Sequence, residues 1–283
     1  MSNETPVSRR ALIGAAVGAA ALTAGVGVAP ASAAVADLNG TWKLNGNGYL
    51  GDLVITHDKK SPSRFSGTMY GEQVNGAYSA LQRTFVIFRG NPRNWLGDFN
   101  QIFVGQVSAT GQSMSGSFFA VTAAYGASAQ RIEYSFAARR GSSAPSIPPA
   151  PTHPAGPPSM AGKYDLRGTI PLPPQPVRLT LNDTGGELWG DVHPGTFGWS
   201  EGWIAGRYAA ASGALFLTEH TFSWPGALFV GSTVEGWAGR IQGTYYKFEH
   251  ITPPANGGGV NSGDHRRDIG LWEPMAYTWF IDT

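Results

Sequence analysis

The sequence predicts an all-β fold of two tandem eight-stranded antiparallel up-and-down β-barrels joined by a proline-rich linker. Three observations lead to this prediction. The 283 residues include 39 glycines and only 14% charged residues, short apolar segments alternate with turn residues, and these segments recur in the same order in both halves. Such a composition is typical of many short strands joined by turns and not of a helical bundle.

The first 33 residues are expected to lie outside the fold. Ser8-Arg9-Arg10 precedes a weakly apolar run rich in Ala and Gly at 11–28, and Ala31-Ser32-Ala33 offers the small residues that a signal peptidase needs. The segment resembles a bacterial twin-arginine (Tat) signal peptide, which implies a secreted, extracellular protein. The Sec route and an uncleaved membrane anchor are the alternatives, and we expect no integral membrane segment in the mature chain.

Charge and cysteine content exclude two classes of function. Because residues 1–33 hold Arg9, Arg10 and Glu4 of the 20 basic and 19 acidic residues, the mature chain keeps 18 of each sign. Nucleic-acid binding needs a surplus of clustered Lys and Arg, so no nucleic-acid partner is expected. The absence of cysteine excludes thiol chemistry and disulfides, so stability must come from burial.

A segment with seven prolines in 18 residues, 142–159, is interpreted as a semi-rigid, extended linker between a first barrel at 37–141 and a second at 160–283. In the first half, strands are expected at 38–44, 52–58, 64–71, 74–81, 83–90, 101–108, 114–121 and 131–139. In the second half, they are expected at 160–166, 177–183, 187–195, 203–210, 214–222, 227–234, 241–250 and 275–282.

The two halves repeat each other in detail. Gly40-Thr41-Trp42 matches Gly162-Lys163-Tyr164, and Phe103-Val104-Gly105 matches Phe229-Val230-Gly231. Two further matches are Gly116-Ser117-Phe118 with Gly243-Thr244-Tyr245, and Tyr134-Ser135-Phe136 with Tyr277-Thr278-Trp279. Several segments alternate apolar and polar residues, as half-buried strands do. Closure of eight strands removes the free edges and encloses an interior that is filled by side chains or holds one small ligand.

Each half resembles the calycin-type barrels of the lipocalin and avidin superfamily. In this superfamily a G-x-W motif opens the first strand; Gly40-Thr41-Trp42 matches it, whereas Gly162-Lys163-Tyr164 has tyrosine in place of tryptophan. In lipocalins a basic residue on the last strand packs over that tryptophan. The resemblance therefore implies that Arg139 or Arg140 covers Trp42.

Common nucleotide and hydrolase motifs give no support for those functions. The run "GNGYLG" at 46–51 fits G-x-G-x-x-G, but a dinucleotide site needs this run between a strand and a helix, and here strand follows strand. We interpret it as a glycine-rich hairpin. The motifs GxxxxGK[ST] and HExxH do not occur in the sequence. GxSxG occurs once, as "GWSEG" at 198–202, in a connection between two expected strands and not at the strand-to-helix turn that a hydrolase nucleophile needs.

Long connections are expected to gather at one rim of the second barrel. In an up-and-down barrel the connections after strands 1, 3, 5 and 7 share a rim, and those at 193–202 and 252–274 are the long ones in the second half. The first half expands 90–99 at the equivalent rim. Loops at one end of a rigid scaffold are where binding and catalysis usually occur, so we place the functional site there.

Four histidines are expected at this rim: His193, His220, His250 and His265. If the protein is an enzyme, they are the catalytic candidates, with Glu219, Glu249 or Asp264 as further acid–base groups and Arg266 or Arg267 steadying an anion. A metal site and a set of solvated rim residues are the other interpretations, and we assign neither a metal nor a cofactor. Glu219 and His220 are adjacent on a strand, so only one of them can enter the same site.

The predicted ligand-binding residues are Trp199, Trp203, Asp264, Arg266, Arg267 and Trp272, all in or beside the long connections. We predict a secreted small-ligand-binding protein whose partner is an apolar small molecule or a glycan. The alternatives are a secreted enzyme (isomerase, cyclase, lyase or hydrolase) at the same rim, and a structural or protein-inhibiting role. The segment 84–88, apolar on both faces, suggests barrel-to-barrel docking or a homodimer.

Overall fold

The computed structural model describes residues 37–58, 61–90, 99–120, 131–169, 177–193, 202–220, 225–237, 239–251 and 271–283. Its first eight strands are β1 (Gly40–Gly46), β2 (Tyr49–Asp58), β3 (Ser61–Met69), β4 (Glu72–Ser79), β5 (Thr84–Gly90), β6 (Phe99–Val107), β7 (Ser113–Ala120) and β8 (Glu133–Arg139). The next eight are β9 (Gly162–Gly168), β10 (Val177–Thr184), β11 (Glu187–His193), β12 (Gly202–Ala209), β13 (Ala214–His220), β14 (Pro225–Thr233), β15 (Arg240–Ile251) and β16 (Leu271–Asp282).

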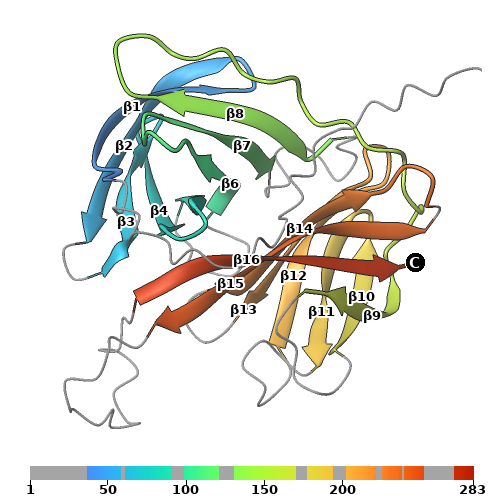
Figure 1. The fold of residues 1–283 in the computed structure, drawn as a ribbon. Helices are drawn as coiled ribbons and strands as arrows, with labels where there is room; N and C mark the ends of the chain where they lie inside the picture. The colour runs from blue at the N-terminus through green and yellow to red at the C-terminus, as the bar shows by residue number, and fades with distance from the viewer. Residues whose placement is uncertain are drawn as a thin grey trace, which may run out of the picture. The chain divides into compact units, whose positions relative to one another are not determined.

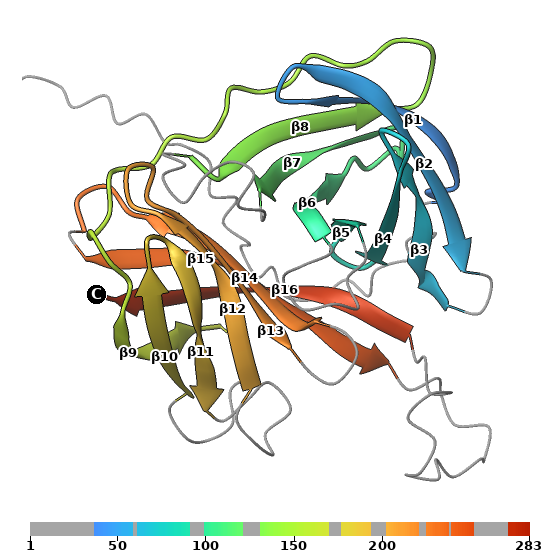
Figure 2. The ribbon, with the colours of Figure 1, turned by 180° about the vertical axis from the view of Figure 1, so that it is seen from behind.

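Each set of eight strands closes on itself as a barrel (Figures 1 and 2). All neighbouring strands are antiparallel and follow one another in chain order. The pairing of Leu44 with Ala138 closes the first barrel, and that of Arg167 with Phe280 closes the second. The predicted fold class, two tandem up-and-down barrels, is therefore confirmed.

The last two strands are longer than the sequence predicts. β16 begins at Leu271 and stays in register with β15, with Leu271 opposite Ile251 and Pro274 opposite Phe248. A proline cannot donate to the ladder and usually marks the end of a strand, so the pattern placed the boundary after it.

The glycine-rich run at 46–51 is a hairpin between β1 and β2. Asn47 and Gly48 both have positive φ, 51° and 89°, which is the conformation of a two-residue type I′ turn. Gly46 lies opposite Tyr49 in the register. The interpretation of this run as a hairpin is confirmed.

The first barrel is filled by an aromatic core. Phe103 stacks on Phe118 with ring centroids 5.0 Å apart, and Phe118 stacks on Tyr134 at 5.2 Å. Phe136 meets Phe103 edge-on at 5.2 Å and 83°. Such edge-to-face and offset contacts are the favoured geometries of aromatic pairs.

The second barrel repeats these contacts position by position. Phe229 lies 4.5 Å from Tyr245, and Tyr245 lies 6.2 Å from Tyr277. Trp279 meets Phe229 edge-on at 5.7 Å and 89°. These are the residues that the sequence paired with Phe103, Phe118, Tyr134 and Phe136, so the barrels are copies in packing as well as in topology.

Trp42 is anchored as the resemblance to lipocalins implies. Its indole Nε1 donates to the Leu38 carbonyl at 3.0 Å, and the Arg140 guanidinium carbon lies 4.6 Å from the centre of its ring. In the second barrel the Tyr164 hydroxyl donates to the Met160 carbonyl at 3.1 Å. Both donors thus reach the carbonyl four residues earlier, which is a further sign of the repeat.

One hydrophobic cluster contains outward-facing residues of both barrels. Val86 and Phe88 of β5 share it with Phe216 of β13 and Leu228 of β14. Phe119 lies 5.8 Å from Phe216, measured between ring centroids. Strand β5 is therefore apolar on both faces because one face fills the first barrel and the other packs in this cluster.

The proline-rich segment 142–159 has no strand, yet it is hydrogen-bonded to both barrels. Side chains donate to four of its proline carbonyls: Asn45 to Pro145 at 3.0 Å, Ser135 to Pro149 at 2.8 Å, Tyr208 to Pro157 at 2.9 Å, and Thr233 to Pro154. A proline has no N–H to satisfy, but its carbonyl remains a full acceptor. The predicted linker is thus a strap fixed along the barrel walls.

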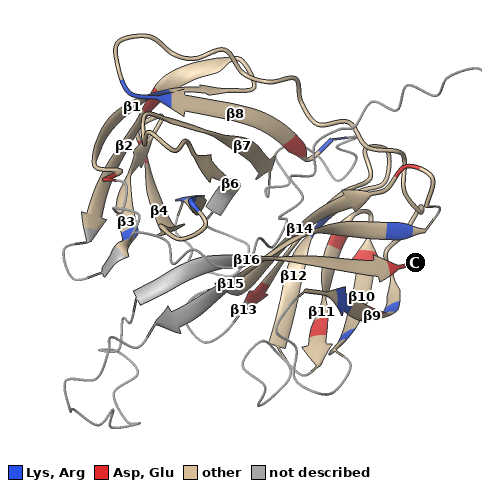
Figure 3. Cartoon of the chain, in the orientation of Figure 1, with Lys and Arg blue, Asp and Glu red and all other residues tan. Residues whose placement is uncertain are grey.

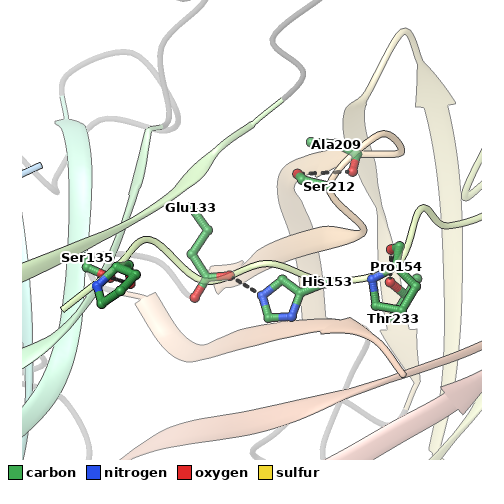
Figure 4. A network of polar contacts seen from close by, with 8 residues as sticks. Glu133, Ser135, His153, Pro154, Ala209, Ser212 and Thr233 are labelled. Atoms are coloured by element: carbon green, nitrogen blue, oxygen red, sulfur yellow. Dashed lines mark hydrogen bonds and ion pairs between the residues drawn. The ribbon is translucent and has the colours of Figure 1, made fainter. Parts of the chain in front are cut away.

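His153, which was not a candidate from the sequence, adds a side-chain hydrogen bond to the strap. Its Nε2 lies 2.8 Å from Oε2 of Glu133 on β8, and the bond from Thr233 to Pro154 follows directly (Figure 4). Gly156 then donates its N–H to the Ala210 carbonyl at 2.8 Å. The strap therefore passes from the first barrel to the second through successive bonded residues.

Charged residues of both signs are interspersed on the described strands of the second barrel (Figure 3). On β9, for example, Lys163 and Arg167 flank Asp165. Across the described residues, the structure contains no helix of the length and apolar character needed to cross a membrane.

Candidate functional site

The strand order puts the connections after β9, β11, β13 and β15 at one end of the second barrel. Five of the ten predicted site residues lie outside the described residues: Trp199, Asp264, His265, Arg266 and Arg267. For three others only the backbone is described: His220, His250 and Trp272. The side chains of His193 and Trp203 are described.

His193 and Trp203 lie on the outer wall of the second barrel. Leu188 and Val192 of β11 belong to the barrel core, so strand alternation turns His193 outward, where it is exposed. Trp203 is 69% exposed, whereas the next residue, Ile204, is fully buried in the core. These two predicted residues therefore do not enter the barrel.

Glu219 is the charged residue that enters the second barrel near this rim. Leu215 and Leu217 of β13 belong to the core, and Glu219, two positions further on, is only 1% exposed. In the register it lies opposite Ile204 and Ala227, both core residues. Of the adjacent pair Glu219 and His220, the glutamate faces the interior.

Gly202 makes room for this carboxylate. A Cβ atom placed on Gly202 would lie 2.3 Å from Oε1 of Glu219 and 2.8 Å from its carboxyl carbon. Both distances are far below a normal contact, so any side chain at 202 would displace the Glu219 carboxylate. The glycine and the glutamate thus form one structural unit.

The first barrel has a different set of residues at the same depth. Arg89 lies opposite Val74 and Gln101, as Glu219 lies opposite Ile204 and Ala227. Arg89 Nη1 donates to Gln101 Oε1 at 2.8 Å, and its Nη2 lies 3.0 Å from Glu72 Oε1. The two terminal nitrogens of the arginine are therefore bound within its own barrel, whereas its buried Nε has no hydrogen-bond partner among the described residues.

Tyr70 closes this end of the first barrel. A Cβ atom on Gly46 would lie 2.8 Å from its hydroxyl oxygen, and one on Gly51 would lie 2.3 Å from its ring carbon Cδ1. The Arg89 guanidinium carbon lies 5.3 Å from the centre of the Tyr70 ring. The hydroxyl donates to the Tyr49 carbonyl at 2.8 Å. Burial raises the pKa of this hydroxyl, so it stays a neutral donor at physiological pH.

We call these two sets the mouth layers: Glu72, Arg89 and Gln101 in the first barrel, and Gly202, Glu219 and Ala227 in the second. At the centre of the second layer, Glu219 has the opposite charge to Arg89. Its neighbours in the layer, Gly202 and Ala227, are the two smallest residue types. From the sequence alone, Glu219 is only one of several candidate carboxylates. Aligning 84–90 with 214–220 would have shown the exchange of Arg89 for Glu219.

Within the described ranges, no three His, Cys, Asp or Glu side chains are grouped so that they could hold a metal ion. The candidate binding group among the described residues is the buried carboxylate of Glu219. Such a group can accept hydrogen bonds or pair with a cation.

Comparison with known proteins found no match to a protein-family model, to a curated protein or to a solved structure. The two closed eight-stranded antiparallel barrels fit a tandem calycin-like fold.

Proposed function

We propose that the protein is a secreted small-ligand-binding protein whose second barrel takes the ligand at its mouth, around Glu219. The difference between the two mouth layers carries this proposal. Two copies of one barrel agree in core, register and anchors, yet their mouth layers differ in every residue: Gly202, Glu219 and Ala227 in the second barrel replace Glu72, Arg89 and Gln101 in the first. When two copies of a fold share their packing and differ at one place, a function of that place is the simplest explanation of the difference.

The proposed ligand combines an apolar body with a hydrogen-bond-donating or cationic head. Glu219 lies opposite Ile204 and Ala227 in the register and two residues after Leu217, all three of which belong to the apolar core. A buried carboxylate in such surroundings is stabilised by a cation or by hydroxyl donors and repels a second anion. Trp199, in the connection after β11, and Trp272, near the start of β16, would add aromatic contacts to the ligand.

We further infer that the chain is a lipocalin-like calycin exported by the twin-arginine route. The stacking of Arg140 over Trp42 and the two barrels support the first inference, and Ser8-Arg9-Arg10 with Ala31-Ser32-Ala33 supports the second. Sequencing the N-terminus of the secreted protein tests the export signal: a start near residue 34 is expected, and an intact N-terminus would contradict it.

Calorimetric titration with octylamine, octanol and octanoate tests the ligand chemistry. These probes share one apolar chain and differ in the head group. Octylamine is expected to bind at least about 10-fold more tightly than octanoate, because only the amine complements a buried carboxylate. The Glu219→Gln variant is expected to lose this preference.

The matched control is Arg89→Gln, which changes the equivalent position of the first barrel. Octylamine binding should be unchanged in this variant. Equal binding of octylamine by the wild type and Glu219→Gln, or the same loss in Arg89→Gln, would reject the proposed site.

A further inference from the structure

The outer wall of the second barrel carries two exposed tryptophans close to the predicted rim. Trp203 on β12 is 69% exposed and Trp189 on β11 is 45% exposed. Indole rings on a strand wall are normally covered, since each offers a large apolar area. Two of them on adjacent strands point to a ligand.

The register places both tryptophans on one face. Trp189 lies opposite Ala205, and Asp191 lies opposite Trp203. The two tryptophans are therefore diagonal neighbours, and the backbone positions of such neighbours in an antiparallel pair are about 7–8 Å apart. Ala205 is fully buried between them, so the indoles rise on either side of a small residue.

Polar groups are interleaved with the rings. Asp191 shares the outer face of β11 with Trp189 and His193, and the exposed Arg178 of β10 lies opposite His193 in the register. The surface is therefore not continuously apolar, because the carboxylate of Asp191 lies beside both tryptophans in the register. Sugar rings fit such a surface, because their C–H faces stack on indoles and their hydroxyls donate to carboxylates.

We propose that Trp189, Asp191 and Trp203 form a polysaccharide-binding surface for an extended neutral glycan chain. The two indoles would stack on sugar rings of the same chain, and Asp191 would accept hydrogen bonds from hydroxyls between them. His193 and Arg178 lie at the margin as further polar contacts. This surface is separate from the mouth layer, since its side chains face outward and Glu219 faces inward.

Co-sedimentation with insoluble cellulose and with chitin tests the surface. The wild-type protein is expected to be depleted from the supernatant by at least one of these glycans. The double variant Trp189→Ala/Trp203→Ala should lose at least about 10-fold in retention, and Asp191→Ala should lose retention while keeping both rings. Trp237→Ala is the control, because Trp237 is 55% exposed but lies in the turn between β14 and β15.

Failure of the wild type to bind either glycan, or equal retention of the wild type and the double variant, would overturn the proposal. Glu219→Gln should co-sediment like the wild type. The titrations with octylamine and the sedimentation assay therefore report on the two sites independently.

Discussion

Arginines stacked on aromatic rings stabilise both barrels. Arg140 covers Trp42. In the second barrel Arg240 lies 4.0 Å from the ring of Trp237 and 4.4 Å from that of Phe280. A cation over an aromatic face contributes about 0.5–1 kcal/mol when partly exposed and more when water is excluded.

Replacing Arg140 by alanine is expected to lower the free energy of unfolding by about 1 kcal/mol, because the cation leaves the Trp42 ring and Arg140 no longer donates to the Asp37 carbonyl. Urea denaturation followed by tryptophan fluorescence measures this loss. Arg131→Ala, just before β8, is the control, and a loss of equal size there would contradict the assigned role.

Asp282 should make stability depend on pH. The hydrogen bond from Arg240 to its carboxylate, 2.7 Å from Nε to Oδ1, is the main cause that lowers the pKa of Asp282. A lowered folded-state pKa stabilises the fold above the unfolded value of about 3.9, and this stabilisation is lost as the pH falls through the folded value.

The stability difference between the wild type and Asp282→Asn is thus expected to be present at pH 6 and to shrink below about pH 4. Urea denaturation of both proteins at several pH values measures it. A difference that stays constant down to pH 2.5 would show that the charge of Asp282 is not its cause.

At single positions the sequence predicted contacts that depend on a recognisable motif and not on the register of neighbouring strands. Arg140 could be anticipated over Trp42 because the motif and the end of the last strand identify both residues. The inward position of Glu219 could not be chosen over His220, because that choice depends on the register of β12, β13 and β14. His193 and Trp203 were assigned to the rim, but the sequence did not show that their side chains lie on the outer face of their strands.

Paired glycines allow neighbouring strands to approach inside both barrels. Gly105 lies opposite Gly116 in the first barrel and Gly231 opposite Gly243 in the second. A Cβ on Gly116 would lie 2.0 Å from the Val104 carbonyl oxygen, and one on Gly243 would lie 1.9 Å from that of Val230. Backbone atoms cannot move aside as a flexible side chain can, so these positions require glycine.

Gly116→Ala and Gly243→Ala are each expected to destabilise the protein by about 2–3 kcal/mol through overpacking. Gly71→Ala is the control: Gly71 has a positive φ of 82° but no atom within 4 Å of a Cβ, so its cost should be about 1 kcal/mol. Denaturant titration gives all three values. Equal costs would contradict the close approach of the strands.

The composition of the strap, residues 142–159, predicts its backbone character but not its hydrogen bonds. Seven prolines in 18 residues predicted an extended linker, and the structure has no strand or helix at 142–159. Its bonds to Asn45, Ser135, Tyr208 and Thr233 could not be predicted, because those donors come from strands distant in the sequence and only the closed barrels bring them to the strap.

The cluster shared by the two barrels couples their stability. Val86, Phe88, Phe216 and Leu228 are each fully buried, and burying such side chains contributes about 1.5–3 kcal/mol each. Neither barrel can unfold without exposing this surface. We therefore expect a single cooperative thermal transition for the wild type.

Phe216→Asp is expected to separate that transition into two, because it places a charge in the shared cluster without entering either barrel core. Differential scanning calorimetry resolves the transitions. Two transitions in the wild type, or one unchanged transition in the variant, would show that the barrels are not coupled through this cluster.

For the molecule as a whole, the sequence predicted the two closed barrels because strand-length segments, their alternation and their repetition all agreed. The internal repeat could not show the functional residues, because it identifies what the two barrels share, whereas function depends on where they differ. The mouth layers differ at three positions that only the strand register aligns.

The stoichiometry of octylamine binding tests this asymmetry most directly. Isothermal titration of the wild-type protein is expected to give one site per chain, and that site should disappear in Glu219→Gln and remain in Arg89→Gln. Two equivalent sites per chain, or one site that survives Glu219→Gln, would contradict the assignment of binding to the second barrel.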